Sequence, residues 1–413
     1  MSVTTRRFAV ATLFTGVIAG LVGLACIHLL HWIQALAWDM HSGTLLEAVS
    51  AVSPARRVLN LVLGGIFGAA SWFFLFRRSR AITSVSAAVG GTPMPPLRAT
   101  WHALTQVLIV GLGASVGREV APREMAAAFS AAAADRLKLT PGDRRIIVAC
   151  GAGAGLAAVY SIPISGAIYT LEILLVSRSR RAVAAAFCTS AIAVLISTGF
   201  TRPTPFYSVP TLTPSLSLTV FAALVGPLLG AAGWAFKQAV ARVGAARPRD
   251  WRLLASLPTA SFVVGVIAVW VPSVLGNGQA SAQTQFDAVW ATGAGLGIAA
   301  LVLAAKTVTT FLTIRAGGWG GVLTHAVALG AGIGTVIGLP WAAAWPGSQV
   351  AVFAFIGAAA FLGASMSAPF TGLILVIEFT AQGPTILVPA TLAVGGATAA
   401  TAWLCRRSLS RAH

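Results

Sequence analysis

Long apolar runs separated by short polar breaks dominate the chain. Between Arg315 and Arg406, Glu378 is the only Asp, Glu, Lys or Arg. A helix that crosses a bilayer needs about 20 apolar residues, so this stretch alone can hold several. A similar run begins directly after Arg6-Arg7 and has no clear cleavage site. The pattern predicts an all-α polytopic membrane protein whose first helix is retained.

Glycine and proline interrupt many of these runs. The chain has 43 glycines and 20 prolines, and residues 317–334, GGWGGVLTHAVALGAGIG, are one example. A broken helix leaves backbone N–H groups free, and inside a membrane these are tolerated where they are buried or line an ion site. A helix N-terminus also carries partial positive charge, which attracts anions. Broken helices of this kind are typical of transporters and channels.

Two segments that lie 206 residues apart share one pattern. Residues 161–174 read SIPISGAIYTLEIL, and residues 367–380 read SAPFTGLILVIEFT. Three arginines follow the first copy and none follows the second, so the positive-inside rule puts their ends on opposite sides of the membrane. Chance similarity between two small-residue helices is the alternative. Our interpretation is one integral membrane domain of two inverted repeats, residues 1–205 and 206–413.

Composition and charge exclude several other classes of protein. The 413 residues are 57% hydrophobic and 9% charged, which is too little charge to cover a soluble domain of this length. The net charge of +18 is spread over short arginine clusters between apolar runs, so we expect membrane lipid and no nucleic acid as a partner. The four cysteines and six histidines show no CxxC or HExxH pattern. We therefore expect no metal and no other cofactor.

One carboxylate stands inside an otherwise apolar region, in the motif GREVAP at residues 117–122. An ionisable residue within a membrane segment is costly and is usually functional, which makes Glu119 the first candidate. The structural alternative is a simple ion pair of Glu119 with Arg118 or Arg123.

Four segments together resemble the chloride channel (ClC) family of chloride channels and proton/chloride antiporters. They are GREVAP, which resembles the gate motif; GAGAGLAAVYSIPISGAIYTLEIL, the helix pair after it; AKTVTTFLTIRAGGWGG with VLTHAVALGAGIG, the segment of the second-half GxFxP motif; and GASMSAPFTGLILVIEFT, the late dimer-interface helix. The resemblance covers about residues 60–400. It implies a ClC-type fold and a homodimer in which each subunit has its own anion pathway.

The resemblance also implies which residues form that pathway. Glu119 matches the gating glutamate, whose carboxylate competes with chloride or a related anion. The residues expected around the anion are Gly117, Arg118 and Val120 beside the gate, Gly90, Gly91 and Thr92 in the VGGTP segment, and Gly321, Val322 and Leu323 in the GVLTH segment.

Several positions depart from the family pattern. Two residues, not one, separate Glu119 from Pro122, and Gly90 stands where the family has a coordinating serine. His325 replaces a proline, so that core packing and a proton role are equally open for it. No tyrosine follows Tyr207, so the coordinating tyrosine near the C-terminus of the family is missing.

A further departure concerns protons. In the antiporters of the family a second glutamate, directly after the position of Glu172, receives protons from the cytoplasm. Ile173 stands there in this chain, so we expect little or no proton movement with the anion. Glu172 itself is expected to bind a nearby helix end. Because the chain ends at His413, no cytoplasmic CBS domains are expected.

These observations favour passive or loosely coupled anion transport, with chloride as the family default, in a bacterial-type cell membrane. Proton/chloride or other halide antiport with an altered proton route is the second interpretation. A membrane-embedded hydrolase needs a nucleophile with a base, or a metal, and no GxSxG or HExxH pattern is present, so no enzyme is expected. A non-conducting scaffold that kept the fold is the remaining alternative.

Overall fold

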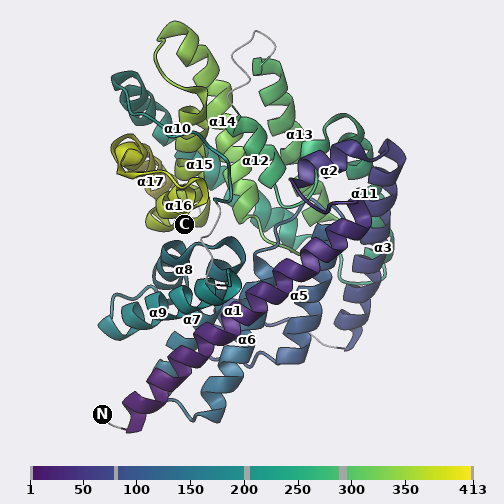
Figure 1. Cartoon of the computed structure of the whole chain (residues 1–413), viewed down its shortest axis with the longest axis vertical. Coiled ribbons are helices and arrows are strands. Elements are labelled where there is room, and N and C mark those ends of the chain that lie inside the picture. Colours follow the sequence, from purple (N-terminus) through teal and green to yellow (C-terminus); the bar gives the residue numbers. More distant parts are fainter. Residues whose placement is uncertain (1–2, 79–81, 200–204, 288–294, 411–413) are drawn as a thin grey trace.

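The computed structural model describes residues 3–78, 82–199, 205–287 and 295–410. Helices account for most of these residues, and their order along the chain is shown by colour in Figure 1. The first half contains α1 (Val3–Trp38), α2 (Leu45–Ala51), α3 (Pro54–Arg78), α4 (Val85–Val89), α5 (Pro96–Gly111), α6 (Val120–Arg136), α7 (Pro141–Tyr160), α8 (Pro163–Tyr169), the π-helical turn η1 (Thr170–Leu175) and α9 (Arg180–Ser197).

The second half repeats this series. It contains α10 (Leu216–Ala245), α11 (Leu253–Trp270), η2 (Pro272–Val274), α12 (Gln279–Phe286), α13 (Gly295–Arg315), α14 (Leu323–Ala344), α15 (Val350–Met366), α16 (Pro369–Thr380), η4 (Pro384–Ile386) and α17 (Leu387–Ser410). In the described part of the chain, eight helices are long and apolar enough to cross a membrane. The predicted all-α membrane fold is confirmed.

The two halves pack their helices in the same way. In the first half α1 packs against α9 and α6 against α7, and in the second half α10 packs against α17 and α14 against α15. In Figure 1 most of the first half lies below most of the second half, although α2 of the first half lies in the upper right of the view. The halves meet where α8 contacts α16 and α3 contacts α11. Even the backbone repeats, since Ser161 and Ser367 end their helices in the left-handed conformation at φ 58° and 53°. The exact boundary between residues 205 and 206 stays a prediction.

Two glutamates join the halves across this contact. Glu172 accepts hydrogen bonds from the backbone N–H of Thr371 at 2.7 Å and of Phe370 at 3.2 Å, at the start of α16. Glu378 accepts from the backbone N–H of Ser165 at 2.6 Å and of Ile164 at 3.1 Å, at the start of α8. Each carboxylate thereby satisfies orphan donors at a positive helix end of the other half. Glu172 has the structural partner that the sequence analysis expected.

Helices α7 and α15 form the centre of the core. Almost every residue from 147 to 160 and from 351 to 364 is buried, and both segments are rich in glycine and alanine. Small residues let backbones approach closely: a Cβ on Gly357 would lie 2.1 Å from the carbonyl oxygen of Gly330 on α14. This close packing fixes α14, and with it the N-terminus that α14 contributes to the site described below.

The small residues of the repeated segment have a different role from the one the sequence suggested. Because small residues permit close helix contact, Ser165, Gly166, Thr371 and Gly372 are natural candidates for a dimer contact. All four are buried within the subunit. Gly166 packs against α7, while the hydroxyl of Thr371 donates to Glu172 at 2.6 Å. These four residues therefore pack inside the subunit and are not available for contact with a second one.

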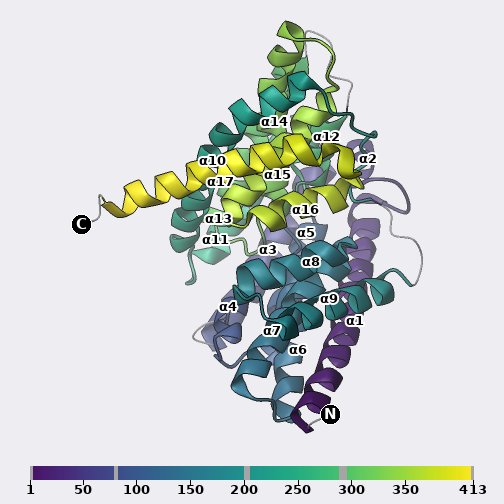
Figure 2. The same ribbon diagram turned by 90° about the vertical axis from the view of Figure 1, so that its left-hand side faces the viewer.

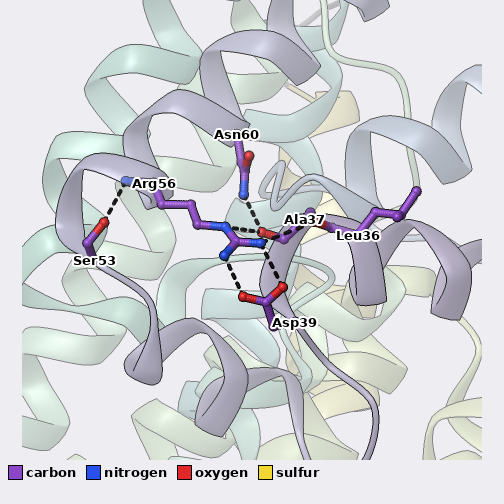
Figure 3. Close-up of polar contacts among 6 residues, drawn as sticks. All are labelled: Leu36, Ala37, Asp39, Ser53, Arg56 and Asn60. Carbon is purple, nitrogen blue, oxygen red and sulfur yellow. Dashed lines mark hydrogen bonds and ion pairs between the residues drawn. The ribbon is translucent and has the colours of Figure 1, made fainter.

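A polar cluster joins the C-terminal end of α1 to α3, as Figure 3 shows. The guanidinium of Arg56, in α3, donates to Asp39 Oδ1 at 3.1 Å and lies 2.5 Å from Asp39 Oδ2. Its Nε donates to the carbonyl oxygen of Ala37 at 2.9 Å, and Asn60 donates to the same oxygen at 2.7 Å. These bonds satisfy carbonyl groups at the end of α1 that have no partner within the helix.

Candidate functional site

Two helix N-termini meet between the halves of the molecule. Gly117 and Gly321 exchange a pair of backbone hydrogen bonds, at 2.8 Å and 3.0 Å, in the one isolated β-bridge among the described residues. Glu119 is the N-cap of α6, and Val322 is the N-cap of α14. The free N–H groups and the positive ends of both helices therefore converge on one place, which suits an anion.

The carboxylate of Glu119 occupies this place. It is fully buried, and its Oε1 accepts a hydrogen bond from the backbone N–H of Leu323 at 2.8 Å. Glycines border it on two sides, because a Cβ on Gly117 would lie 2.1 Å from Oε2 and a Cβ on Gly321 would lie 2.0 Å from Oε1. A side chain at either glycine would collide with the carboxylate. The structural alternative, an ion pair with Arg118 or Arg123, is absent from the ion pairs of the described residues.

Tyr160, at the end of α7, completes the contacts of this carboxylate. Its hydroxyl donates to Glu119 Oε2 at 3.3 Å. The guanidinium carbon of Arg118 lies 5.1 Å from the centre of the Tyr160 ring and 5.7 Å from that of Phe206. Phe379, from α16, packs against both rings. A tyrosine hydroxyl thus reaches the site from the first half of the chain, whereas the sequence has no tyrosine after Tyr207 to supply one near the C-terminus.

The other predicted residues divide into two groups. Val120 is the first residue of α6, so it lies beside Glu119 together with Arg118, and the segment 321–323 lies directly opposite. The turn at residues 90–92 is different, because it follows the C-terminal end of α4 and is exposed. Its N–H groups donate to carbonyl oxygens of α4.

That geometry disfavours the turn as an anion ligand. A helix C-terminus carries partial negative charge, and N–H groups that are already bonded cannot donate to an anion. No hydrogen bond joins Gly90, Gly91 or Thr92 to Glu119 in the described part of the chain. The anion-binding roles of these three residues, like those of the residues around Gly117 and Gly321, stay predictions.

A buried lysine holds the loop that precedes Glu119. Lys306, in α13, is fully buried and donates to Ser115 Oγ at 2.9 Å and to the carbonyl oxygens of Val274 at 2.7 Å and Gly276 at 3.0 Å. Ser115 lies two residues before Gly117, so the lysine fixes this loop against η2 and the residues after it. The lysine therefore lies in the interior of the molecule, beside the site.

His325 lies in the first turn of α14. It is fully buried, and neither ring nitrogen has a hydrogen-bond partner among the described residues. Both the packing and the proton interpretation remain open for it. No group of three or more His, Cys, Asp or Glu residues in the described ranges has the arrangement of a metal site.

Comparison with known proteins agrees with this geometry. The sequence profile described as voltage gated chloride channel matches residues 64–402. The chain belongs to the ClC family. The voltage-gated ClC-type chloride channel ClcB of Escherichia coli (strain SMS-3-5 / SECEC) is 28% identical over 399 residues, which cover 91% of each chain.

Solved ClC structures share the fold over nearly the whole chain. A slow cyanobacterial Cl⁻/H⁺ antiporter superposes with a TM-score of 0.81 at 18% identity and covers 98% of both chains. A CLC-type fluoride/proton antiporter gives 0.69 at 19% identity, over 95% of both. A eukaryotic CLC transporter gives 0.71 at 18% identity, over 97% of this chain and 72% of its own. As a member of this family, the chain is a multi-pass membrane protein of anion transport.

Proposed function

We propose that the chain transports chloride passively or with loose coupling, and that Glu119 is the gate. The observation that carries the proposal is the hydrogen bond from the Leu323 N–H to the Glu119 carboxylate. A carboxylate at this helix end mimics the transported anion and competes with it for the same donor. A proton on Glu119 removes the negative charge, weakens the bond and releases the position to the anion. The names of the ClcB relatives support chloride as the anion.

Antiport of protons against chloride or another halide is the second candidate. It is supported by the names of two structural relatives, a Cl⁻/H⁺ antiporter and a fluoride/proton antiporter. Their names also differ in the anion, so the ion carried by this chain has to be measured.

The direct experiment is anion efflux from proteoliposomes across a panel of chloride, bromide, nitrate and fluoride, with external pH recorded at the same time. We expect chloride efflux well above that of protein-free liposomes. An absence of efflux for every anion in the panel contradicts the proposal and leaves a non-conducting scaffold.

A homodimer through α8 and α16 belongs to the same proposal. Figure 2 shows both helices on the side that faces the viewer. Ile164 and Phe370, at equivalent positions of the repeat, are 47% and 66% exposed there. Large apolar side chains of this exposure suit a contact with a second subunit or with lipid. Alanine at both positions is expected to weaken the dimer in single-molecule counting in bilayers, whereas alanine at the exposed Phe262 of α11 leaves it intact. A monomeric wild type contradicts this part of the proposal.

For the membrane we propose the bacterial plasma membrane, with the arginines at 178, 180 and 181 in the cytoplasm. The arginine asymmetry between the two copies of the repeat supports this orientation. Cysteine labelling from outside is expected to modify position 382 and not position 179. The reverse labelling pattern refutes it.

A further inference from the structure

A buried polar cluster next to the gate joins α5 to α6. His102 Nδ1 lies 2.6 Å from Glu124 Oε2, and Gln106 Nε2 lies 2.8 Å from that nitrogen and 3.1 Å from that oxygen. All three side chains are buried. Two bare acceptors, an imidazole lone pair and a carboxylate, repel each other at such a distance, so a proton has to lie between them. The cluster therefore holds a proton on Nδ1 or on Oε2.

Few other charges surround this proton. Among the described residues, no Lys or Arg forms an ion pair with Glu124. Arg123, the neighbour of Glu124 on α6, bonds to the Tyr169 hydroxyl instead. Arg247 and Arg249 lie over the ring of Trp319, which packs edge-on against the His102 ring at 5.4 Å. In the described part of the chain, no side chain of α1, α3, α4 or α7 forms a hydrogen bond or ion pair with the cluster.

A small pocket lies one helical turn away from the cluster. Its volume is about 140 Å³, and Arg98 and Ala99 of α5 line it together with Leu75 of α3. Arg98 is one turn before His102 on the same face of α5. His102 Nε2, the ring nitrogen opposite Glu124, is buried without a protein partner among the described residues. Nε2 can therefore accept a proton, while Nδ1 on the other side of the ring faces Glu124.

On the other side of the cluster lies the gate. Glu124 and Glu119 stand on the same helix, about 7.5 Å apart along its axis at 1.5 Å per residue. That span is longer than a hydrogen bond, so water has to bridge it. The two carboxylates of the repeated segment, Glu172 and Glu378, accept hydrogen bonds from backbone N–H groups at helix starts and are poorly placed to exchange protons.

We propose that the cluster of His102, Gln106 and Glu124 is a proton-binding site that exchanges protons with Glu119 and gives anion transport a partial coupling to protons. His102 takes a proton at Nε2 and passes the one at Nδ1 to Glu124, which leaves the ring as the neutral Nε2–H tautomer. Glu124 gives this proton through bridging water to the Glu119 carboxylate. The proton on Nε2 then moves through water to Nδ1, which restores the first tautomer. The inference rests on Glu119 as the gate, and it revises the expectation from Ile173 that protons hardly move.

The second half of the chain offers a comparison. Lys306 occupies the position equivalent to His102, 204 residues later, just as Gly321 is equivalent to Gly117. Lys306 bonds to two carbonyl oxygens and a hydroxyl, with no carboxylate partner among the described residues. The first half alone thus pairs an imidazole with a carboxylate at this position, in the half that also carries Glu119.

The test records chloride and proton movement together in proteoliposomes with an imposed chloride gradient and a clamped membrane potential. We expect chloride efflux from wild type to drive proton uptake. Glu124→Gln keeps hydrogen-bonding capacity but cannot carry the proton, so we expect chloride flux within threefold of wild type and proton uptake at least tenfold slower. Glu172→Gln, the matched control, changes a carboxylate of the repeated segment and is expected to keep the wild-type proton-to-chloride ratio.

Two results overturn the inference: chloride flux without proton uptake in wild type, or a wild-type ratio in Glu124→Gln. If Glu124→Gln carries no chloride because it misfolds, His102→Gln tests the cluster from α5, and a wild-type ratio in that variant overturns the inference as well. Failure of the proposed function has a different signature, because then wild type carries no chloride or Glu119→Gln leaves flux unchanged.

Discussion

The two halves of the chain share one pair of equivalent carboxylates, and the first half has a further carboxylate, Glu119, that the second half lacks at the equivalent position. Glu172 and Glu378 are equivalent in the repeat, and each binds the helix start of the other half. Glu119 has no such counterpart, because the equivalent residue of the second half is Leu323, whose backbone N–H binds the Glu119 carboxylate. Where the repeat keeps its symmetry the carboxylates hold the fold together, and where it breaks, one half supplies an acid and the other supplies the donor. A symmetric scaffold thereby presents one asymmetric site.

The largest effect is expected from closing the space between the two halves at Gly321. In Gly321→Ala the new Cβ lies 2.0 Å from Glu119 Oε1, so the flexible carboxylate has to leave the α14 N-terminus. Loss of a hydrogen bond to a charged group, about 1.5 kcal/mol, corresponds to about a tenfold change, so chloride efflux at neutral pH should rise by about that factor.

The control for this variant is Gly395→Ala in α17, where a Cβ meets nothing within 4 Å. Efflux through both variants is compared with wild type at pH 7.5. Unchanged efflux and pH dependence in Gly321→Ala contradict the position assigned to the carboxylate.

The symmetric pair should respond symmetrically. Glu172→Ala and Glu378→Ala each leave two helix-start N–H groups and one hydroxyl without their acceptor. Each should cost about 1–3 kcal/mol of stability, measured as a lower unfolding temperature in detergent. Glu172→Gln retains an acceptor oxygen and should lose less. A large decrease of the unfolding temperature in only one of the two alanine variants contradicts the equivalence of Glu172 and Glu378.

The smallest effect concerns a pair outside the repeat symmetry, Asp39 with Arg56. Hydrogen bonds from Arg56 lower the pKa of the Asp39 carboxyl from its ordinary value of 3.8. Because the pKa is lower in the folded protein, the ionised Asp39 stabilises the fold at pH values above the ordinary pKa. This contribution is lost as pH falls through the lowered pKa of the folded state. Asp39→Asn should therefore unfold slightly earlier than wild type at pH 7, and the two curves should converge in acid. A gap in unfolding temperature that does not shrink as pH falls argues against this linkage.

The sequence was sufficient for the architecture. Apolar runs between arginine clusters predict the membrane helices, and the two copies around Glu172 and Glu378 predict the repeat. Both depend on local patterns that can be recognised in the amino-acid sequence alone. The role of Glu119 came from its motif, and the break before α14 came from the glycines of the 317–321 segment.

The contacts that could not be predicted from the sequence depend on the direction of each helix and on which of its faces packs against a neighbour. Tyr160 reaches Glu119 from 41 residues away, at the end of a helix whose direction is fixed by packing. His102 meets Glu124 only because α5 and α6 fold back on each other with these two faces together. Ser165 and Gly166 are buried inside the subunit for the same reason, although small residues in a helix are also suited to a dimer contact.

The central claim is that the Glu119 carboxylate occupies the position of the transported anion. The most direct measurement is chloride efflux from proteoliposomes between pH 4.5 and 8, for wild type and Glu119→Gln, with Glu172→Gln as the control for loss of a carboxylate. Wild type and the control should transport faster as pH falls, and Glu119→Gln should transport at one rate throughout, close to the acid rate of wild type. The same pH dependence in Glu119→Gln as in wild type would contradict the account.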